Sequence, residues 1–411
     1  MKRTLSLMLA LLLLLTCAAA LAEAPKSDVT LSVLSNVTGV VNETLAEVCK
    51  DFTAETGINI EYAAPSNDYE SLMKTKMAAG DLPDVFTTHG WSVARYSSFL
   101  RPMNDQAWFG DISDFIRPMI TDDAGNVFVL PVDMDIAGIV YNRDILTECG
   151  INVDDIQTWA DFETACEAIK AKGYIPVYVG GKDDWTIGQF FDWVAPSFFV
   201  TNEAQNDGAA LLDGSFDWSK WGDLVEMFAK WNQEGYLNKD AATSDYATCT
   251  AELGKGNVAF EFFGNYAIID ALKEGNANLG MMPVPAYIEG DTPTLIAGER
   301  LAIGVWKDSK YSDEAMQLIN YFARPEVMSK LASASGNPAG LNGVDSDVGD
   351  LAQDFAKYAD VRTFPYFDRV YLPNGMWNDL CSTGLGIVNG SMSTEDICQQ
   401  MAESYLEKRA Q

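Results

Sequence analysis

The sequence contains little histidine and little cysteine. One histidine, His89, and seven cysteines are spread over 411 residues, and no two cysteines form a C-x-x-C pair. Zinc sites draw on clustered Cys and His, and disulfide scaffolds need closely spaced cysteines. The sequence therefore predicts no metal site and no disulfide scaffold. We expect most of the cysteines to be buried thiols, and the spacing leaves open one or two disulfides.

Positive charge is also scarce. The chain has 28 Lys and Arg against 59 Asp and Glu, which gives a formal net charge of −31. A strongly acidic protein is repelled by the phosphates of nucleic acids and by anionic lipid surfaces. This charge balance argues against DNA, RNA or phospholipid as partners.

Long apolar runs are absent except at the start of the chain. The run Leu5–Leu15 is shorter than the ~20 residues that a membrane-spanning helix needs. It follows Lys2-Arg3 and leads to Ala20-Leu21-Ala22, the pattern of an export signal cleaved after residue 22. We therefore expect an exported protein, extracellular or periplasmic. The segment before Cys17 loosely resembles a lipobox, so membrane anchoring through a lipidated Cys17 stays open.

The first part of the chain alternates between extended and helical patterns. Strands are predicted over 29–34, 58–62 and 84–87, with apolar residues at helical spacing between them and Gly57 and Gly80 at the helix ends. This order predicts a parallel sheet with right-handed crossovers. Ligands bind beyond the carboxyl ends of such strands, which is where His89 and Trp91 fall.

A second alternation follows and predicts another α/β unit. Extended segments are expected at 139–141 and 176–180, with helices over 158–172, 185–194 and 221–235. A further strand at 301–305 precedes helices at 312–322 and 326–333, and helices are expected to fill most of 350–411. The chain is too long for one compact core, so the sequence predicts an α/β protein of two lobes.

Several segments, in order along the chain, resemble one known family. They read MAAGDLPDV at 77–85, LP at 130–131, IVYNRD at 139–144, TWADF at 158–162, GNVAF at 256–260, GNY at 264–266, AG at 297–298, LAI at 301–303 and NPA at 337–339. Together they resemble the extracellular solute-binding proteins of bacterial ABC importers, in the carbohydrate-binding branch related to maltose-binding protein. The resemblance covers nearly the whole chain after residue 22.

The resemblance implies two Rossmann-like lobes joined by a hinge that the chain crosses more than once. Carried onto this sequence, it implies an N-terminal lobe of residues 28–133 and 296–340 and a C-terminal lobe of 134–295 and 341–411. It further implies a monomer that binds a mono- or oligosaccharide between its lobes and delivers it to ABC permease subunits, with no cofactor. Asn265, Tyr266, Glu299 and Arg300 would face the ligand. Tyr266 and the pair Glu299-Arg300 depart from the family pattern, which leaves the identity of the sugar open.

Sugars present hydroxyls and flat C–H faces, so their sites combine hydrogen-bonding side chains with aromatic platforms. Asp133 and Asp135 flank Met134 in a segment that, if extended, places both carboxylates on one side. Trp185 and Trp377 are expected to lie in polar, glycine-containing loops, where aromatics often line pockets. In contrast, five tryptophans lie in or beside amphipathic helices and are expected in the core: Trp159, Trp193, Trp218, Trp221 and Trp231.

Other interpretations of these residues remain open. His89 is either a hydrogen-bonding wall of the cleft or a buried structural residue, and the two aspartates are otherwise solvated loop acids. Acids with aromatics also bind polyamines through ion pairing and cation–π contacts. A secreted glycoside hydrolase needs two carboxylates across the scissile bond, whereas Asp133 and Asp135 would reach the same side of a ligand. Neither G-x-S-x-G nor a P-loop is present, so the sequence favours a binding protein over an enzyme.

Overall fold

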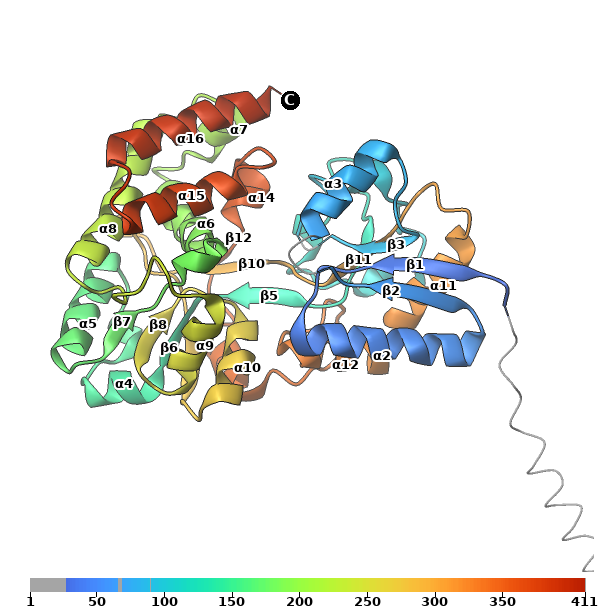
Figure 1. Ribbon diagram of the computed structural model, residues 1–411, viewed down its shortest axis with the longest axis horizontal. Helices are drawn as coiled ribbons and strands as arrows, with labels where there is room; N and C mark the ends of the chain where they lie inside the picture. Colours follow the sequence, from blue (N-terminus) through green and yellow to red (C-terminus); the bar gives the residue numbers. More distant parts are fainter. Residues whose placement is uncertain (1–26, 66–68, 89, 411) are drawn as a thin grey trace, which may run out of the picture.

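The computed structural model describes residues 27–65, 69–88 and 90–410, which fold into two α/β lobes lying side by side (Figure 1). The sequence-based predictions for the export signal, Cys17 and His89 fall outside these residues. Within the described part of the chain, no helix combines the length and the apolar character needed to cross a membrane.

The first lobe is built on a five-stranded sheet of order β2-β1-β3-β11-β4. Its strands are β1 (Thr30–Leu34), β2 (Asn59–Ala63), β3 (Val85–Thr87), β4 (Val129–Pro131) and β11 (Ala302–Val305). β1 pairs in parallel with both β2 and β3, which confirms the parallel arrangement expected from the sequence. β11 is antiparallel to β3 and β4, so a strand from late in the chain completes the sheet.

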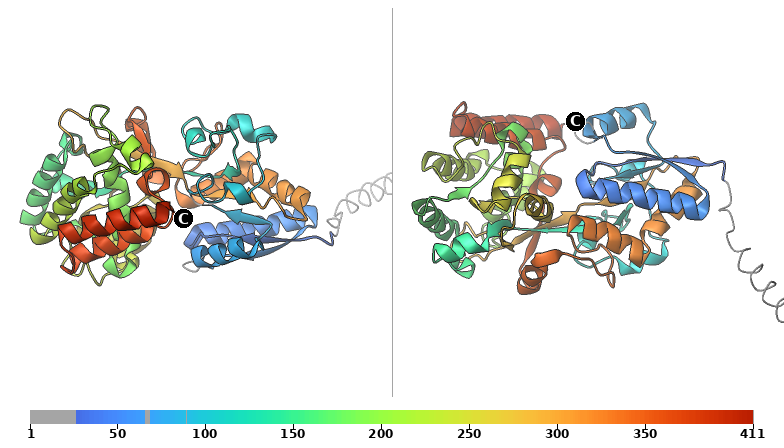
Figure 2. Two further views of the ribbon diagram at one scale, coloured as in Figure 1. Left: turned by 90° about the horizontal axis from the view of Figure 1, so that it is seen from above. Right: turned by 60° about the horizontal axis from the view of Figure 1, so that its bottom comes forward.

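Helices cover both faces of this sheet, as the views of Figure 2 show. They are α2 (Gly39–Thr56), α3 (Tyr69–Ala79), α11 (Ser312–Phe322) and α12 (Pro325–Ser335), with short 3-10 turns η2 (Ser97–Phe99), η3 (Ala107–Asp111) and η4 (Arg117–Met119). In α2, Val41, Leu45, Val48 and Phe52 are buried at the predicted helical spacing. Gly57 ends this helix in the left-handed conformation (φ 76°), which costs a glycine little.

The second lobe contains a four-stranded sheet of order β7-β8-β6-β9. These strands are β6 (Ile139–Asn142), β7 (Ile175–Val177), β8 (Val258–Glu261) and β9 (Leu279–Met282). β6 is antiparallel to β8 and β9, while β7 is parallel to β8. The sequence did not predict β8 or β9.

Helices surround this second sheet, and those near the C-terminus pack on helices from the middle of the chain. The first group is α4 (Arg143–Glu148), α5 (Trp159–Ala171), α6 (Trp185–Phe199), α7 (Gly208–Asp213), α8 (Trp221–Gln233), α9 (Tyr246–Gly254) and α10 (Asn265–Glu274). The later group is α13 (Ala352–Lys357), α14 (Phe367–Tyr371), α15 (Trp377–Val388) and α16 (Thr394–Arg409). α14 and α15 contact α6, and α16 contacts α8. Short 3-10 turns are η5 (Val153–Asp155), η6 (Gly181–Asp183), η7 (Trp218–Lys220) and η8 (Gly349–Leu351).

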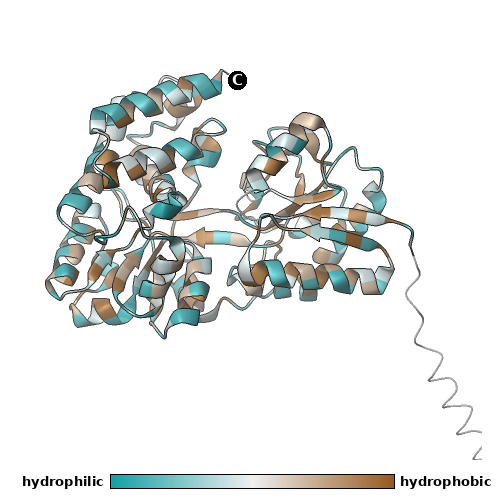
Figure 3. Ribbon diagram, in the orientation of Figure 1, coloured by the Kyte–Doolittle hydropathy of each residue, from teal (hydrophilic) through white to brown (hydrophobic). Residues whose placement is uncertain are grey.

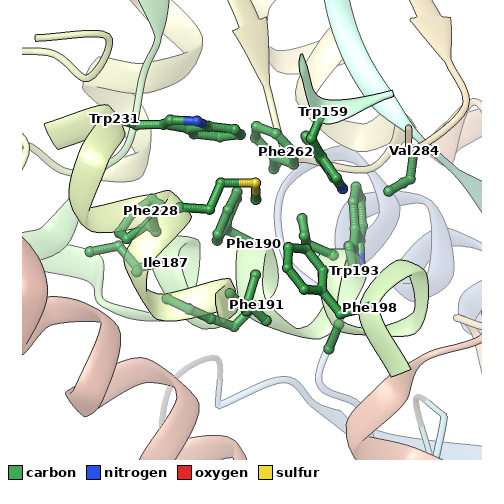
Figure 4. Close-up of a cluster of buried hydrophobic side chains, with 14 of the residues drawn as sticks. Trp159, Ile187, Phe190, Phe191, Trp193, Phe198, Phe228, Trp231, Phe262 and Val284 are labelled. Atoms are coloured by element: carbon green, nitrogen blue, oxygen red, sulfur yellow. The ribbon is translucent and has the colours of Figure 1, made fainter. Parts of the chain in front are cut away.

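The core of the second lobe is rich in aromatic side chains from α5, α6 and α8 (Figure 4). The five tryptophans expected in the core are all buried there, which confirms that prediction. The helices expose hydrophilic residues on the outside of both lobes, while hydrophobic residues concentrate on the strands (Figure 3). Each lobe therefore has an aliphatic or aromatic core of its own.

A three-stranded sheet joins the lobes. It consists of β12 (Thr363–Pro365), β10 (Leu295–Glu299) and β5 (Met134–Ala137), with β5 and β10 antiparallel. Figure 1 shows β5 and β10 running between the lobes, so the chain crosses from β4 to β5 and returns from β10 to β11. A further crossing follows Leu341, which packs in the first lobe, before Leu351, which packs in the second. The hinge is thus crossed more than once.

The six cysteines in the described residues are free thiols. Four of them are buried, Cys49, Cys166, Cys249 and Cys381, as expected for most of the cysteines. Burial raises the pKa of the Cys49 thiol to about 12, so this group stays neutral and behaves as a small apolar side chain.

Candidate ligand-binding cleft

A cavity of about 470 Å³ lies between the two lobes, and we call it the inner compartment. The first lobe, the hinge and the second lobe all contribute to its walls. It is lined by Asn36, Val37, Thr38, Tyr69, Trp91, Asp135, Trp185, Gln189, Asp192, Tyr266, Arg300, Tyr366, Asp368, Arg369 and Trp377. Six of the lining residues are aromatic, and they come from both lobes: Tyr69, Trp91, Trp185, Tyr266, Tyr366 and Trp377.

A second cavity of about 610 Å³, the outer compartment, adjoins the first. The two share Thr38, Trp185, Tyr266 and Arg300 as lining residues. The remaining wall of the outer compartment has fewer aromatic residues and includes Lys182, Asp183, Asp184, Asp270 and Lys273. The space between the lobes is therefore a cleft of two connected parts with different chemistry.

The structure brings six of the residues singled out from the sequence to the wall of the inner compartment. They are Trp91, Asp135, Trp185, Tyr266, Arg300 and Trp377. Trp185 and Trp377 are the first residues of α6 and α15, so the expectation that they lie in loops was wrong. The helix expected over 185–194 does begin at Trp185, although neither Asp184 nor Met376 makes a side-chain cap.

Asp133 does not line the cavity, because it is fully buried beneath it. Its carboxylate accepts hydrogen bonds from Leu301 N (2.6 Å), Ser335 Oγ (2.6 Å) and Arg300 Nη1 (3.1 Å). A buried carboxylate with three donors has little capacity left for a ligand. Asp133 instead fixes the position of Arg300, which does reach the cavity.

Asp135 sits at the wall itself, on the hinge strand β5. It accepts hydrogen bonds from Tyr366 Oη (2.7 Å) and Asn337 Nδ2 (3.1 Å). Burial raises the pKa of Asp135, and the neighbouring Arg300 and the Tyr366 hydrogen bond oppose that rise. The Arg300 guanidinium also lies 5.9 Å from the centre of the Tyr266 ring, within cation–π range.

Asn265 and Glu299 also lie behind the wall rather than in it. Asn265 is buried and donates to Asn337 Oδ1 (2.8 Å), and Asn337 in turn supports Asp135. Glu299 is buried and accepts a hydrogen bond from the backbone N–H of Ser92 (2.9 Å). Burial raises the pKa of Glu299, and the hydrogen bond from Ser92 opposes that rise. Asn265 thus supports Asp135 through Asn337, and the Glu299 backbone carbonyl supports Arg369, from whose Nη1 it accepts a hydrogen bond (3.0 Å).

The sequence analysis missed several lining residues, including Gln189 and Asp192 on α6. Trp185, Gln189 and Asp192 follow each other at helical spacing and share one face of a helix that is otherwise almost entirely apolar. Two polar residues on the face of a buried helix are a usable signal, because buried polar groups need partners. Gln189 Oε1 accepts a hydrogen bond from Tyr266 Oη (3.1 Å).

Tyr366, Asp368 and Arg369 were missed as well. They lie in and just before the short helix α14, after a strand of three residues, and no periodic pattern marks this segment. The backbone N–H of Asp368 donates to Asp192 Oδ1 (2.7 Å), which brings two carboxyl groups together. Burial and the charge of Asp368 raise the pKa of Asp192 well above its usual value.

The cleft combines flat aromatic faces with carboxyl, amide and guanidinium groups, which suits a ligand with hydroxyls and nonpolar faces. Two α/β lobes joined by a repeatedly crossed hinge, with such a cleft between them, define a two-lobed ligand-binding protein. The chain belongs to the bacterial extracellular solute-binding proteins, whose family model matches residues 38–329. This confirms the family resemblance and the two-lobed fold expected from the sequence.

Known relatives resemble the chain over nearly its full length. The melibiose/raffinose/stachyose-binding protein MelE of Bacillus subtilis is 33% identical over 419 residues, covering 100% of this chain and 98% of the relative. A sugar transporter of Bacillus licheniformis, solved in complex with stachyose, is 32% identical with a TM-score of 0.86, covering 93% of this chain and 100% of that one. A binding protein of B. subtilis, solved in an open conformation, is 33% identical with a TM-score of 0.86, covering 94% and 98%.

Proposed function

We propose that this protein is the binding component of an ABC importer, and that it captures an oligosaccharide between its lobes and delivers it to a membrane permease. The observation that carries the proposal is the inner compartment, where aromatic rings from both lobes surround a set of hydrogen-bonding groups. The proposal is also supported by the similarity to MelE and to the protein that was solved with stachyose.

The wall of the inner compartment suits a neutral saccharide. Trp91 from the first lobe and Trp185 and Trp377 from the second offer flat faces for sugar C–H groups. Gln189 and the carboxyls of Asp135 and Asp192 offer hydrogen-bond partners for hydroxyls. The adjoining outer compartment extends the cleft, so the space favours an oligosaccharide over a single sugar unit.

A polyamine is the less suitable ligand. The inner compartment has three aspartates, but Arg300 and Arg369 stand among them and would repel a cation. Burial also favours the neutral form of Asp192, which lowers its attraction for an ammonium group.

A thermal-shift screen tests the ligand class. The protein is heated with melibiose, raffinose, stachyose, maltose or spermidine, and binding to the folded state must raise its stability, by about 2.7 kcal/mol at a hundredfold excess over Kd. We expect at least one saccharide to raise the melting temperature in a saturable way and spermidine to leave it unchanged. Stabilisation by spermidine alone would replace the saccharide proposal with the polyamine alternative.

The ligand is expected to leave the cleft unchanged. Hydrolysis of a glycosidic bond needs a pair of carboxyl groups across it, whereas Asp192 and Asp368 stand side by side and the third carboxyl, Asp135, already accepts hydrogen bonds from Tyr366 and Asn337. Mass spectrometry of the bound saccharide after long incubation checks this. Cleaved sugar in proportion to protein concentration would contradict it.

The lobes proposed to close on the ligand are those expected from the sequence, residues 28–133 with 296–340 and residues 134–295 with 341–411, with the last crossing after Leu341, which packs in the first lobe. A ligand selects a closed state only if it contacts both lobes, as the lining of the inner compartment allows. We propose that the closed monomer then docks on the permease subunits.

Export is part of the same proposal and concerns residues 1–22. The family is extracellular, and the N-terminal sequence has the pattern of an export signal. Intact-mass analysis of the secreted protein should give a chain that starts at Glu23. A mass that corresponds to a diacylglyceryl group on Cys17 would instead establish a lipid anchor.

A further inference from the structure

Arg369 of α14 reaches from the second lobe to the hinge and to the first lobe. Its guanidinium lies 3.7 Å from the centre of the Tyr366 ring and 5.5 Å from that of Trp91. Its Nη1 donates to the backbone carbonyl of Glu299 (3.0 Å), at the end of β10. One side chain therefore contacts an aromatic residue of each lobe and the hinge strand between them.

Two glycines make room for this guanidinium. A Cβ on Gly298 would lie 2.7 Å from Arg369 Nη1 and 2.8 Å from Tyr366 Cδ2, closer than real contacts allow. A Cβ on Gly90 would fall on the guanidinium itself, and Gly90 also has a positive φ of 100°. Gly90 belongs to the turn before Trp91, and Gly298 belongs to β10. The slot for Arg369 thus has one wall from the first lobe and one from the hinge.

Glu299 connects the same slot to the first lobe. Its carboxylate accepts from the backbone N–H of Ser92 (2.9 Å), while its carbonyl accepts from Arg369. Further out on this side of the cleft, Arg95 Nη2 donates to Asn374 Oδ1 (2.8 Å), a second contact between the lobes. The turn of residues 90–95 is therefore held against the segment 366–374 of the opposite lobe.

We propose that Arg369 is a positioning residue that sets the angle between the lobes and thereby brings Trp91 opposite Tyr366 across the inner compartment. The inference rests on the proposed function of the cleft in ligand capture. When Arg369 leaves its slot, the two aromatic walls lose their common partner and the lobes separate on this side.

The test compares Arg369→Met and Arg369→Lys with the wild-type protein. Met removes both the charge and the planar group at similar length, and Lys keeps the charge but cannot stack as a plane. Small-angle scattering without ligand measures the radius of gyration, and calorimetry with stachyose measures affinity. We expect both variants to have a larger ligand-free radius. We expect Met to bind about tenfold more weakly, which corresponds to ~1.4 kcal/mol, and Lys to lie between Met and wild type.

The glycine slot supplies an independent variant. Gly298→Ala adds one methyl group where Arg369 and Tyr366 lie, and should reproduce the larger radius and weaker binding while leaving Arg369 in the sequence. In the double variant with Arg369→Met, the extra loss from Gly298→Ala should be smaller than in wild type, because the clash with Arg369 is removed while the clash with Tyr366 remains. Two controls apply the same chemistry elsewhere: Arg324→Met removes an arginine that stacks on Tyr321 and pairs with Glu55, and Gly110→Ala adds a methyl group in open space.

The outcomes separate this inference from the proposed function. A loss of affinity in Arg369→Met with an unchanged ligand-free radius would make Arg369 a direct ligand contact and overturn the positioning role. An unchanged affinity in both Arg369 variants would overturn it as well. If stachyose binds neither wild type nor variants, the ligand-free radius still decides the positioning role. Circular dichroism melting identifies any variant that fails to fold, and Arg369→Lys, the mildest change, then supplies the comparison.

Discussion

Trp185 is one of the four residues that line both compartments of the cleft. It begins α6 and lies within 5.1 Å of the Tyr246 ring centre and 5.8 Å of that of Phe263, which hold its orientation. It is only partly buried, so one face stays available in the cleft. An aromatic ring fixed on one face and open on the other is suited to stack on a sugar.

Replacing Trp185 with Ala should therefore weaken saccharide binding by about 1–3 kcal/mol, as for other large aromatic contacts at binding sites. The melting temperature without ligand should change little, since the residue lies at the surface of the cleft. Calorimetry gives the affinity and thermal denaturation gives the stability. Normal binding by the Ala variant would place Trp185 outside the site.

Glu261 of β8 is a buried acid away from the cleft. It is fully buried, and neither carboxyl oxygen has a hydrogen-bond partner within the described residues. Burial raises its pKa well above the usual value, and its charge contributes to the raised pKa values of Tyr246 and Cys249 nearby. The neutral acid is thus the form that the folded core accommodates.

The folded state therefore keeps a proton on Glu261 that the unfolded chain releases. The stability from this group is present below the unfolded pKa and is lost as the pH rises toward the folded pKa. Glu261→Gln stays neutral, so relative to wild type it should gain up to about 1.4 kcal/mol per pH unit as the pH rises above the unfolded pKa of about 4.3. Urea denaturation at several pH values measures the difference. A wild-type-to-Gln difference independent of pH would show that Glu261 is ionised in the folded protein, as it is in the unfolded chain.

The limits of prediction at single residues have a physical cause. Trp91, Asp135 and Arg300 could be proposed from strand ends and from family resemblance, because those features are local in sequence. Asp133 and Asp135 are both aspartates in the same short segment, and the sequence does not distinguish them. In the structure, the carboxylate oxygens of Asp133 already accept hydrogen bonds from Ser335 Oγ and the backbone N–H of Leu301. The role of Arg369 depends on Gly90 and Gly298, which leave room for its guanidinium and are far from it in sequence.

At the scale of elements, the long helices were predictable because residues close together in the sequence mark their faces and their ends. α2 has a regular apolar stripe and a glycine at its end. The start of α5 is marked by Thr158, its N-cap residue, and by Asp161 three residues later. Strands such as β4, β9 and β12 were not predicted. They are three or four residues long, and pairing with distant segments defines them.

The capping box of α5 gives a test at this scale. Thr158 Oγ1 accepts from the backbone N–H of Asp161 (3.3 Å), and Asp161 Oδ2 accepts from the backbone N–H of Thr158 (2.9 Å). Thr158→Ala should lower the free energy of unfolding by about 0.5–2 kcal/mol, whereas Thr158→Ser keeps the cap and should cost less. Saccharide affinity should be equal in both variants, because α5 does not line the cleft. Equal stability of the Ala and Ser variants would show that the cap contributes nothing here.

At the scale of the whole molecule, two lobes with separate cores meet at a narrow hinge. Strands β5 and β10 carry Asp135 and Glu299, so the hinge also contributes groups to the cleft or next to it. A ligand in the cleft can contact both lobes at once. Binding can therefore change the angle between the lobes about the hinge. The order of strands and helices predicted two lobes. The meeting of their residues in one cleft depends on the hinge sheet, which the sequence did not predict.

In the proposed function, a saccharide binds between the lobes and draws them together. The most direct measurement is small-angle scattering during titration with the saccharide that stabilises the protein most in the thermal screen, with tryptophan fluorescence recorded in parallel. The radius of gyration should fall and should saturate at the same saccharide concentration as the fluorescence change. A saturating fluorescence change with a constant radius would contradict closure of the lobes around the ligand.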